Sequence, residues 1–270
     1  MKVLLLDAYN LIYRAKSGFT KGEYYVVYNF FRGLRPLIEK FSPDKVYFVL
    51  EGVPEFRKTL NENYKSNRVN NDQSFHKQKA QIISIMKQCF PATSLRHPKL
   101  ECDDTIATLV SVHHKKGDQC TIISSDSDFY QLLNYFDSCQ IYNPVQKKMI
   151  ETPLYDYVTW KALRGDATDN ISGIPGCGDK TATKLVMGDV KDFKHYLLAK
   201  PGRQEIFERN VNLIRLVDFS NNLEELEINE GSANWEELFD LFHEMGFTSM
   251  VKEKTWNKYV KTFNNLQKDR

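Results

Sequence analysis

Acidic side chains recur in this chain wherever a predicted strand ends and at two helix-associated clusters. The nine acids are Asp7, Glu51, Asp126 and Asp128 after strands, and Glu101, Asp103, Asp104, Asp166 and Asp169 in the clusters. In open α/β sheets, ligands bind at the edge where the carboxyl ends of the strands meet. Nine carboxylates at one such edge could not all stay ionised without compensating cations.

This donor set consists of oxygen atoms alone, without a cysteine or a suitably spaced histidine. Oxygen donors favour a hard ion, Mg²⁺ or Mn²⁺, and this number of carboxylates can hold two. Two such ions suit in-line displacement at a phosphate diester, where one activates water and the other stabilises the leaving oxygen. The residues therefore predict a metal-dependent phosphodiesterase that acts on nucleic acid.

Residues 164–188 combine acids with a hairpin rich in Gly and Pro. Asp166 and Asp169 are three residues apart, so one helical turn could aim both at the same point. The stretch Gly173–Gly178 predicts a tight turn with exposed backbone N–H groups, followed by a helix that Asp179 caps. Such a turn at a helix start is typical of phosphate binding. The alternative is an ordinary loop between two helices.

A strongly basic segment precedes the clustered acids. Residues 57–99 hold nine Lys or Arg against two acids, an excess that suggests a polyanionic partner. Basic residues beside Tyr64 suit phosphates together with a stacked base. We interpret the segment as a mobile basic arch over the sheet edge; an unrelated surface loop is the alternative.

Strands and helices that could position these groups alternate in the first half of the chain. Apolar runs at Val3–Leu6 and Val46–Leu50 flank a helical pattern at 23–40, which predicts a βαβ unit and a parallel sheet. A third strand is predicted at Cys120–Ile123. Beyond Gly188 the patterns are helical, at 189–199, 204–217 and 235–245. The fold class is therefore α/β, with a central, mostly parallel sheet flanked by helices.

Composition narrows the class of protein further. The chain of 270 residues is 41% hydrophobic and 27% charged, a balance typical of soluble globular proteins. Five cysteines without a Cys-x-x-Cys pair favour a reducing compartment. No apolar run approaches the roughly 18 residues of a membrane span. We expect an intracellular, cytoplasmic protein with no membrane contact.

Five blocks of sequence together resemble the bacterial and bacteriophage 5′-nuclease (flap endonuclease) family, which includes the 5′-nuclease domain of bacterial DNA polymerase I. The blocks occur in family order: Leu6–Asn10, Phe56–Arg57 with Tyr64–Arg68, Glu101–Asp104, Ser125–Asp128 and Gly165–Gly176. The resemblance covers about residues 1–250. It implies a PIN-like fold and a two-metal nuclease that cuts 5′ flaps and removes nucleotides from 5′ ends, RNA primers included.

The resemblance also implies roles for particular residues. Glu101 and Asp103 would bind one metal with Asp7 nearby, while Asp126, Asp128, Asp166 and Asp169 would bind the other; Asp104 belongs to the same acidic set. Lys65 and Arg68 would contact the scissile phosphate. The nucleic-acid contacts implied are Arg57, Tyr64, Lys65, Arg68, Gly173, Ile174, Gly176, Gly178, Lys180 and Lys184. A helix-hairpin-helix at 163–188 would grip duplex DNA, with a K⁺ ion held by hairpin carbonyls.

The resemblance divides the chain into a nuclease core at 1–162, with the arch at about 57–97, and a helical region at 163–270. It implies a monomer that binds a 5′ flap, a DNA 5′ end or an RNA/DNA hybrid, and a chain that ends where the nuclease module ends, without a fused polymerase. A replication-protein partner is not identifiable from the sequence.

One position departs from the family pattern. The family usually has Asp where this chain has Glu51, which could still reach a metal or weaken that site. Two alternatives to a 5′ nuclease are an RNase of the PIN type, which lacks such a hairpin, and an inactive DNA-binding module.

Overall fold

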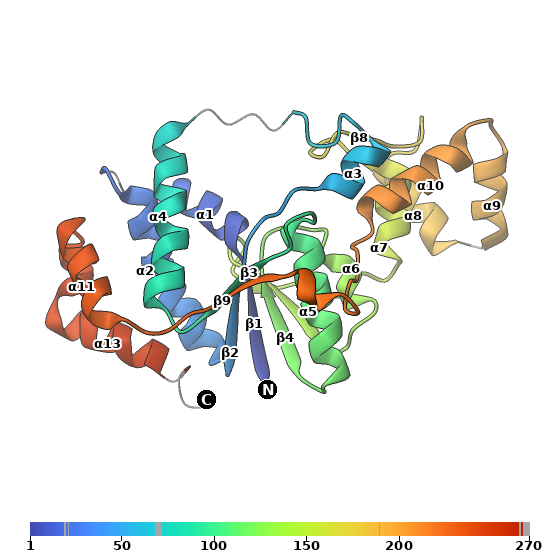
Figure 1. Ribbon diagram of the computed structural model, residues 1–270. Helices are drawn as coiled ribbons and strands as arrows, with labels where there is room; N and C mark the ends of the chain where they lie inside the picture. Colours follow the sequence, from blue (N-terminus) through green and yellow to red (C-terminus); the bar gives the residue numbers. More distant parts are fainter. Residues whose placement is uncertain (19, 21, 68–71, 189, 265, 267–270) are drawn as a thin grey trace.

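A seven-stranded sheet forms the centre of the computed structural model, which describes residues 1–18, 20, 22–67, 72–188, 190–264 and 266 (Figure 1). Its strand order is β6-β5-β4-β1-β2-β3-β9. The inner strands are β1 (Lys2–Asp7), β2 (Lys45–Val49), β3 (Thr93–Arg96), β4 (Gln119–Ile123) and β5 (Cys139–Asn143), and every pairing among them is parallel. The predicted α/β class with a mostly parallel sheet is confirmed.

Both edges of the sheet are short antiparallel strands. β6 (Lys148–Met149) pairs with β5 and forms the edge on that side. β9 (Glu227–Glu230) pairs with β3 and lies in a region predicted to be helical throughout. All four residues of β9 are exposed, so the strand carries no alternation of buried and exposed side chains that could identify it.

Strand β1 is buried on both faces, because successive side chains of a strand point to opposite sides. Leu4 and Leu6 pack in one core with helices α1 (Ala8–Lys16), α2 (Tyr25–Phe41) and α4 (Gln73–Cys89). Val3 and Leu5 pack in a second core with α5 (Cys102–Lys115) and α6 (Tyr130–Leu133). This three-layer packing explains the apolar run that predicts the strand.

The C-terminal helices return to the first core. The C-terminal part of the chain forms α11 (Trp235–Glu244), α12 (Thr248–Val251) and α13 (Glu253–Asn264), and α11 and α13 lie on the same side of the molecule as α2 (Figure 1). Phe242 of α11 and Tyr259 of α13 are buried in the first core together with residues of α2. Tyr259 Oη donates a hydrogen bond of 3.1 Å to the Phe31 carbonyl. The expected division at residue 162 therefore does not separate two packing units, since residues 227–264 complete the core of the first.

A second helical group lies on the opposite side of the sheet edge (Figure 1). It contains α3 (Glu55–Leu60), α7 (Tyr157–Arg164), the two-stranded ribbon β7 (Gly165–Asp166) and β8 (Ile171–Ser172), α8 (Asp179–Met187), α9 (Val190–Leu198) and α10 (Arg203–Ile214). The short helix η1 (Leu223–Glu225) precedes β9. The helices of this second group and its ribbon surround two small apolar clusters, separate from the two cores that flank the sheet.

Much of the predicted arch at 57–97 belongs to the core. Phe75, Ile82 and Met86 of α4 are buried in the first core, and β3 is an inner strand of the sheet. Residues 61–67 of the predicted arch follow α3 outside any helix or strand, and residues 68–71 lie outside the described residues. Among the described residues, no helix has both the length and the apolar character required to cross a bilayer.

Candidate metal centre and nucleic-acid interface

A cleft of about 1360 Å³ opens where β1, β2 and β4 end. The predicted carboxylates that line it are Asp7, Glu51, Glu101, Asp103 and Asp126. Parallel pairing of β2 and β4 with β1 brings three of them to one edge, and the first turn of α5 adds Asp103. Lys58 and Lys65 also line the cleft, so cations face the acids across it.

Asp7 is held rigidly at the end of β1. Its carboxylate accepts hydrogen bonds from Ser124 Oγ at 2.7 Å and from the Asn10 backbone N–H at 3.1 Å, the second of which caps α1. Burial raises the pKa of Asp7 to about 6 against these hydrogen bonds, and the neighbouring Asp126 adds to the rise. The residue therefore serves as a helix cap and also presents a carboxylate to the cleft.

The raised pKa values of Glu51 and Asp103 indicate most clearly that a positive charge would stabilise the carboxylates of this cleft. Burial, followed by the field of Glu101, raises the pKa of Glu51 to about 8. The pKa of Asp103 is raised well above its usual value by burial and then by Asp126 and Asp7. Buried carboxylates that repel one another in this way require a cation to ionise together. Their all-oxygen chemistry fits a hard divalent ion at this place.

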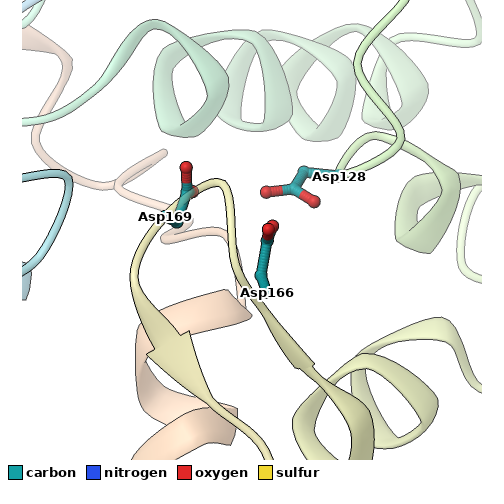
Figure 2. Close-up of side chains that lie close together, drawn as sticks. All are labelled: Asp128, Asp166 and Asp169. Carbon is teal, nitrogen blue, oxygen red and sulfur yellow. The ribbon is translucent and has the colours of Figure 1, made fainter. Parts of the chain in front are cut away.

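A second group of carboxylates consists of Asp128, Asp166 and Asp169 (Figure 2). Each offers one oxygen atom, and these oxygens lie within 4.8 Å of one another. Asp128 follows β4, whereas Asp166 lies in β7 and Asp169 in the turn between β7 and β8. The sequence predicts that these two acids share a helical turn, which is wrong: the ribbon bends sharply between them and brings both towards Asp128.

Lys161 of α7 contacts this second group, and sequence reasoning missed it. Its side chain is only 4% exposed, and its Nζ lies 2.6 Å from Asp166 Oδ2 and in contact with Asp128 Oδ1. Its neighbours Val158 and Ala162 are buried. A lysine between apolar helix positions is a signal that could have found it, because buried lysines are nearly always paired.

Asp128 and Asp166 both pair with Lys161, but their pKa values are shifted in opposite directions. Burial, only partly offset by the lysine, raises the pKa of Asp128 to about 6. Burial also acts to raise the pKa of Asp166, but Lys161 and backbone hydrogen bonds hold it below its usual range. The two aspartates raise the pKa of Lys161 despite its burial, so the lysine is charged.

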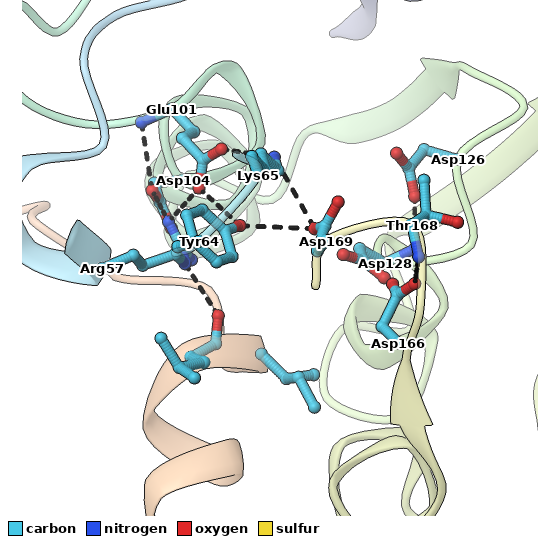
Figure 3. Close-up of polar contacts among 12 residues, drawn as sticks. Arg57, Tyr64, Lys65, Glu101, Asp104, Asp126, Asp128, Asp166, Thr168 and Asp169 are labelled. Carbon is cyan, nitrogen blue, oxygen red and sulfur yellow. Dashed lines mark hydrogen bonds and ion pairs between the residues drawn. The ribbon is translucent and has the colours of Figure 1, made fainter. Parts of the chain in front are cut away.

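Arg57 lies inside the protein, although it was expected to contact DNA. Its Nη1 lies 2.7 Å from Glu101 Oε2, and its guanidinium makes two hydrogen bonds to Asp104 (Figure 3). It is 3% exposed and also donates to the Leu213 carbonyl at 2.8 Å. Asp104 is fully buried by this pair and completes the capping box of α5, so it has a structural role rather than the expected metal role.

Tyr64 likewise differs from its expected role of stacking on a base. The residue is 4% exposed, so its ring offers no open face. Its hydroxyl has two acceptors, Glu101 Oε2 at 3.0 Å and Asp169 Oδ2 at 3.3 Å (Figure 3). Tyr64 thus connects the two groups of carboxylates.

Lys65 follows Tyr64 and faces the cleft. Its Nζ contacts Glu101 Oε1 and lies 3.7 Å from Asp169 Oδ2. Its side chain is 18% exposed, so the ammonium can be reached from the cleft. Arg68, its expected companion at the phosphate, lies outside the described residues.

The predicted hairpin at Gly173–Gly178 is a turn that a backbone hydrogen bond joins to the end of α7. Ile174 N–H donates to the Leu163 carbonyl at 2.8 Å, and Cys177 N–H donates to the Ile174 carbonyl at 2.9 Å. Gly176 has a φ of 81°, which favours glycine. Ile174 is 2% exposed and packs in the cluster of α7 and α8, so its side chain anchors the turn and makes no outward contact.

Helix α8 begins directly after the turn. Gly178 is its N-cap, whereas the sequence predicts Asp179; Asp179 lies in the first turn and pairs with Arg164 at 2.6 Å. Gly178 adds no side chain beside the first N–H groups, and Lys180 and Lys184 are exposed. Gly173 is only partly exposed, and a Cβ there would lie 2.1 Å from the Arg164 carbonyl oxygen.

The chain shares its sequence pattern with known nucleases and polymerases. Residues 2–160 match the family model described as the N-terminal resolvase-like domain of 5′-3′ exonucleases. The thermostable DNA polymerase I of Thermus thermophilus is 31% identical over 233 residues, which is 80% of this chain and 28% of that protein. The chain therefore spans about a quarter of the length of this curated relative.

Solved structures from bacteriophage T5 have a similar fold. A T5 flap endonuclease, in a pseudo-enzyme-product complex with DNA and metal ions, matches with a TM-score of 0.65 at 19% identity, over 99% of this chain and 100% of that one. The T5 5′-exonuclease with bound zinc matches with a TM-score of 0.63 at 21% identity, over 99% of both chains. At these identities, the likeness bears on the fold alone.

Proposed function

Because this chain belongs to the 5′-3′ exonuclease family, we propose that it is a metal-dependent nuclease that hydrolyses phosphodiester bonds at 5′ ends and 5′ flaps of DNA. The observation that carries the proposal is the pair of carboxylate groups at one sheet edge, one lining the cleft and one connected to it through Tyr64. Their oxygen donors and raised pKa values fit divalent ions.

The residues divide between two ions, Mg²⁺ or Mn²⁺. We assign Asp7, Asp103 and Asp126, with Glu51 and Glu101 beside them, to the first ion. Asp128, Asp166 and Asp169 are assigned to the second. Bound ions would supply an activated water and a counter-charge for the leaving oxygen.

Other side chains would orient the substrate. Lys65 faces the cleft beside Glu101, so its ammonium can move to a phosphate oxygen once a cation takes over the carboxylates. The turn at Gly173–Gly178 and the start of α8 present exposed backbone and Lys180, which suits the phosphates of a duplex. A K⁺ ion at the turn, an RNA/DNA hybrid as a second substrate and a monomeric state complete the proposal.

A labelled 5′-flap duplex tests this function directly. The wild-type protein should cleave it with Mg²⁺ and not with EDTA, and Asp128→Ala should lower the rate at least a hundredfold. The matched control is Asp137→Ala, because the side chain of Asp137 is 94% exposed and lies outside both carboxylate groups.

The same assay separates the alternatives. Metal-dependent cutting of single-stranded RNA without cutting of the flap duplex would favour an RNase of the PIN type. Duplex binding without any cleavage would indicate an inactive DNA-binding module, and full activity in Asp128→Ala would contradict the assignment of the site.

A further inference from the structure

The second carboxylate group already has a cation in its midst. Lys161 Nζ contacts one oxygen of Asp128 and lies 2.6 Å from one oxygen of Asp166. Figure 2 shows the carboxylates of Asp128 and Asp166 directed towards the same space. The lysine side chain is 4% exposed, so water cannot provide the solvation that its charge would otherwise need.

In the first carboxylate group, the lysine and arginine partners within the described chain all contact Glu101, which pairs with Arg57 Nη1 at 2.7 Å and with Lys65 Nζ. None of Asp7, Asp103 and Asp126 forms an ion pair with a lysine or arginine of the described chain. The ordering of these acids comes from uncharged donors instead, such as the Ser124 hydroxyl at Asp7. The two groups therefore differ in which carboxylates the protein's own cations contact: Glu101 at the border of the first group, but Asp128 and Asp166 themselves in the second.

We propose that Lys161 is a resident counter-ion of the second group, which holds Asp128 and Asp166 together before a divalent ion arrives and makes that ion bind more weakly than the ion of the first group. This inference rests on the proposed two-metal function. It assigns Lys161 as a positioning residue and not as a catalytic one.

The physical reason is competition for the same oxygen atoms. A divalent ion at Asp128 and Asp166 requires lone pairs that the ammonium now occupies, so the ion must displace Lys161 or remain beside a like charge. Displacement is opposed by burial, since the lysine side chain is only 4% exposed and its ammonium would lose both carboxylate partners. Either route lowers the affinity of the second ion relative to the first.

A Mn²⁺ titration of the whole chain, followed by electron paramagnetic resonance at pH 8 without nucleic acid, measures both affinities. We expect a tight and a weak class of sites in the wild type. In Lys161→Met the weak class should tighten at least tenfold while the tight class stays unchanged, and Lys161→Arg should keep a weak second class. Lys115→Met is the matched control, because Lys115 is exposed and its Nζ donates to the Ser220 hydroxyl, away from both carboxylate groups.

A separate readout follows the metal-free protein. Lys161→Met should melt at a lower temperature than the wild type in EDTA, and saturating Mn²⁺ should raise its melting temperature by more than that of the wild type. If Lys161→Met does not fold, Lys161→Gln provides the same test, because its amide can still donate to a carboxylate without carrying a charge.

The outcomes separate this inference from the proposed function. A wild type that binds no Mn²⁺ would overturn the proposed two-metal function itself. Two classes of sites in the wild type, with an unchanged or weakened second class in both neutral variants, would overturn only the role of Lys161.

Discussion

The guanidinium of Arg57 and the carboxylate of Asp104 form two hydrogen bonds, of 2.6 and 2.8 Å, inside the protein. The same arginine donates to the carbonyl of Leu213, in the last turn of α10, and to the carbonyl of Arg215, directly after α10. One side chain therefore joins α3, the start of α5 and the segment that follows α10, and it fixes the base of the basic segment beside the cleft.

Removal of this arginine should be costly. Arg57→Met leaves Asp104 buried and without its cation, so we expect the free energy of unfolding to fall by about 3–5 kcal/mol in urea denaturation. The control is Arg96→Met, because the ion pair of Arg96 with Glu227 is about half exposed and should contribute less than about 1 kcal/mol. Equal losses in the two variants would contradict the structural role of Arg57.

Tyr64 should matter for stability more than for nucleic-acid binding. Tyr64→Phe removes a buried hydroxyl that bonds to Glu101 or Asp169, so a loss of about 1–2 kcal/mol is expected. Affinity for a 5′-flap duplex in Ca²⁺, measured by fluorescence anisotropy, should change less than twofold because the ring is buried. A large loss of affinity at unchanged stability would restore the stacking role.

The turn at Gly173–Gly178 can be tested at its tip. Gly176→Val places a branched side chain on exposed backbone at a φ of 81°, and we expect duplex affinity to fall at least tenfold with Mn²⁺ binding unchanged. Gly117→Val is a matched control, since Gly117 has a φ of 76° and equally open surroundings between α5 and β4. Equal losses of duplex and metal binding would contradict the separation of the two sites.

Stability of the metal-free protein should fall as the pH rises. The pKa of Glu51 is raised from 4.5 to about 8, so the folded state binds its proton more tightly than the unfolded state does. Its contribution is fully present below pH 4.5 and is lost as the pH rises through 8. Between pH 6.5 and 9 this amounts to about 2 kcal/mol, at about 1.4 kcal/mol per pH unit up to the folded pKa.

Glu51→Gln isolates that contribution. Urea denaturation in EDTA should show a shallower fall of stability with pH in the variant than in the wild type over the same window. Parallel pH profiles for the two proteins would contradict the raised pKa of Glu51, whatever other groups titrate in that range.

The elements that could be predicted from the sequence are those whose burial leaves a pattern of apolar residues within a short stretch of the chain. Apolar runs identified β1 and β2, and acids at strand ends indicated one edge, because burial leaves a periodic mark on the chain. β9 was missed because all its residues are exposed and its pairing with β3 is a long-range event. Arg57 and Lys161 were misplaced or missed for the same reason, since a charged residue carries no sign of a distant buried partner.

The bend between Asp166 and Asp169 shows a different limit. Three residues of spacing fit a helical turn, but Gly165 has a φ of 81° and ends α7, and Asn170 at 58° turns the ribbon back. The proximity of the two acids was predicted correctly and its cause was not. The positive φ values of this glycine and this asparagine produce a two-stranded ribbon at the place where the spacing suggests a helical turn.

The packing of α13 against α2 has a consequence for how the chain is made. Phe31 stacks on Phe90 and contacts Phe242, and its carbonyl accepts from Tyr259, a residue 228 positions later. At roughly 5–20 residues per second, a ribosome needs about 10–45 seconds to supply that partner. Throughout this interval the part of α2 that Phe242 and Tyr259 cover in the folded protein stays without its partners on the nascent chain.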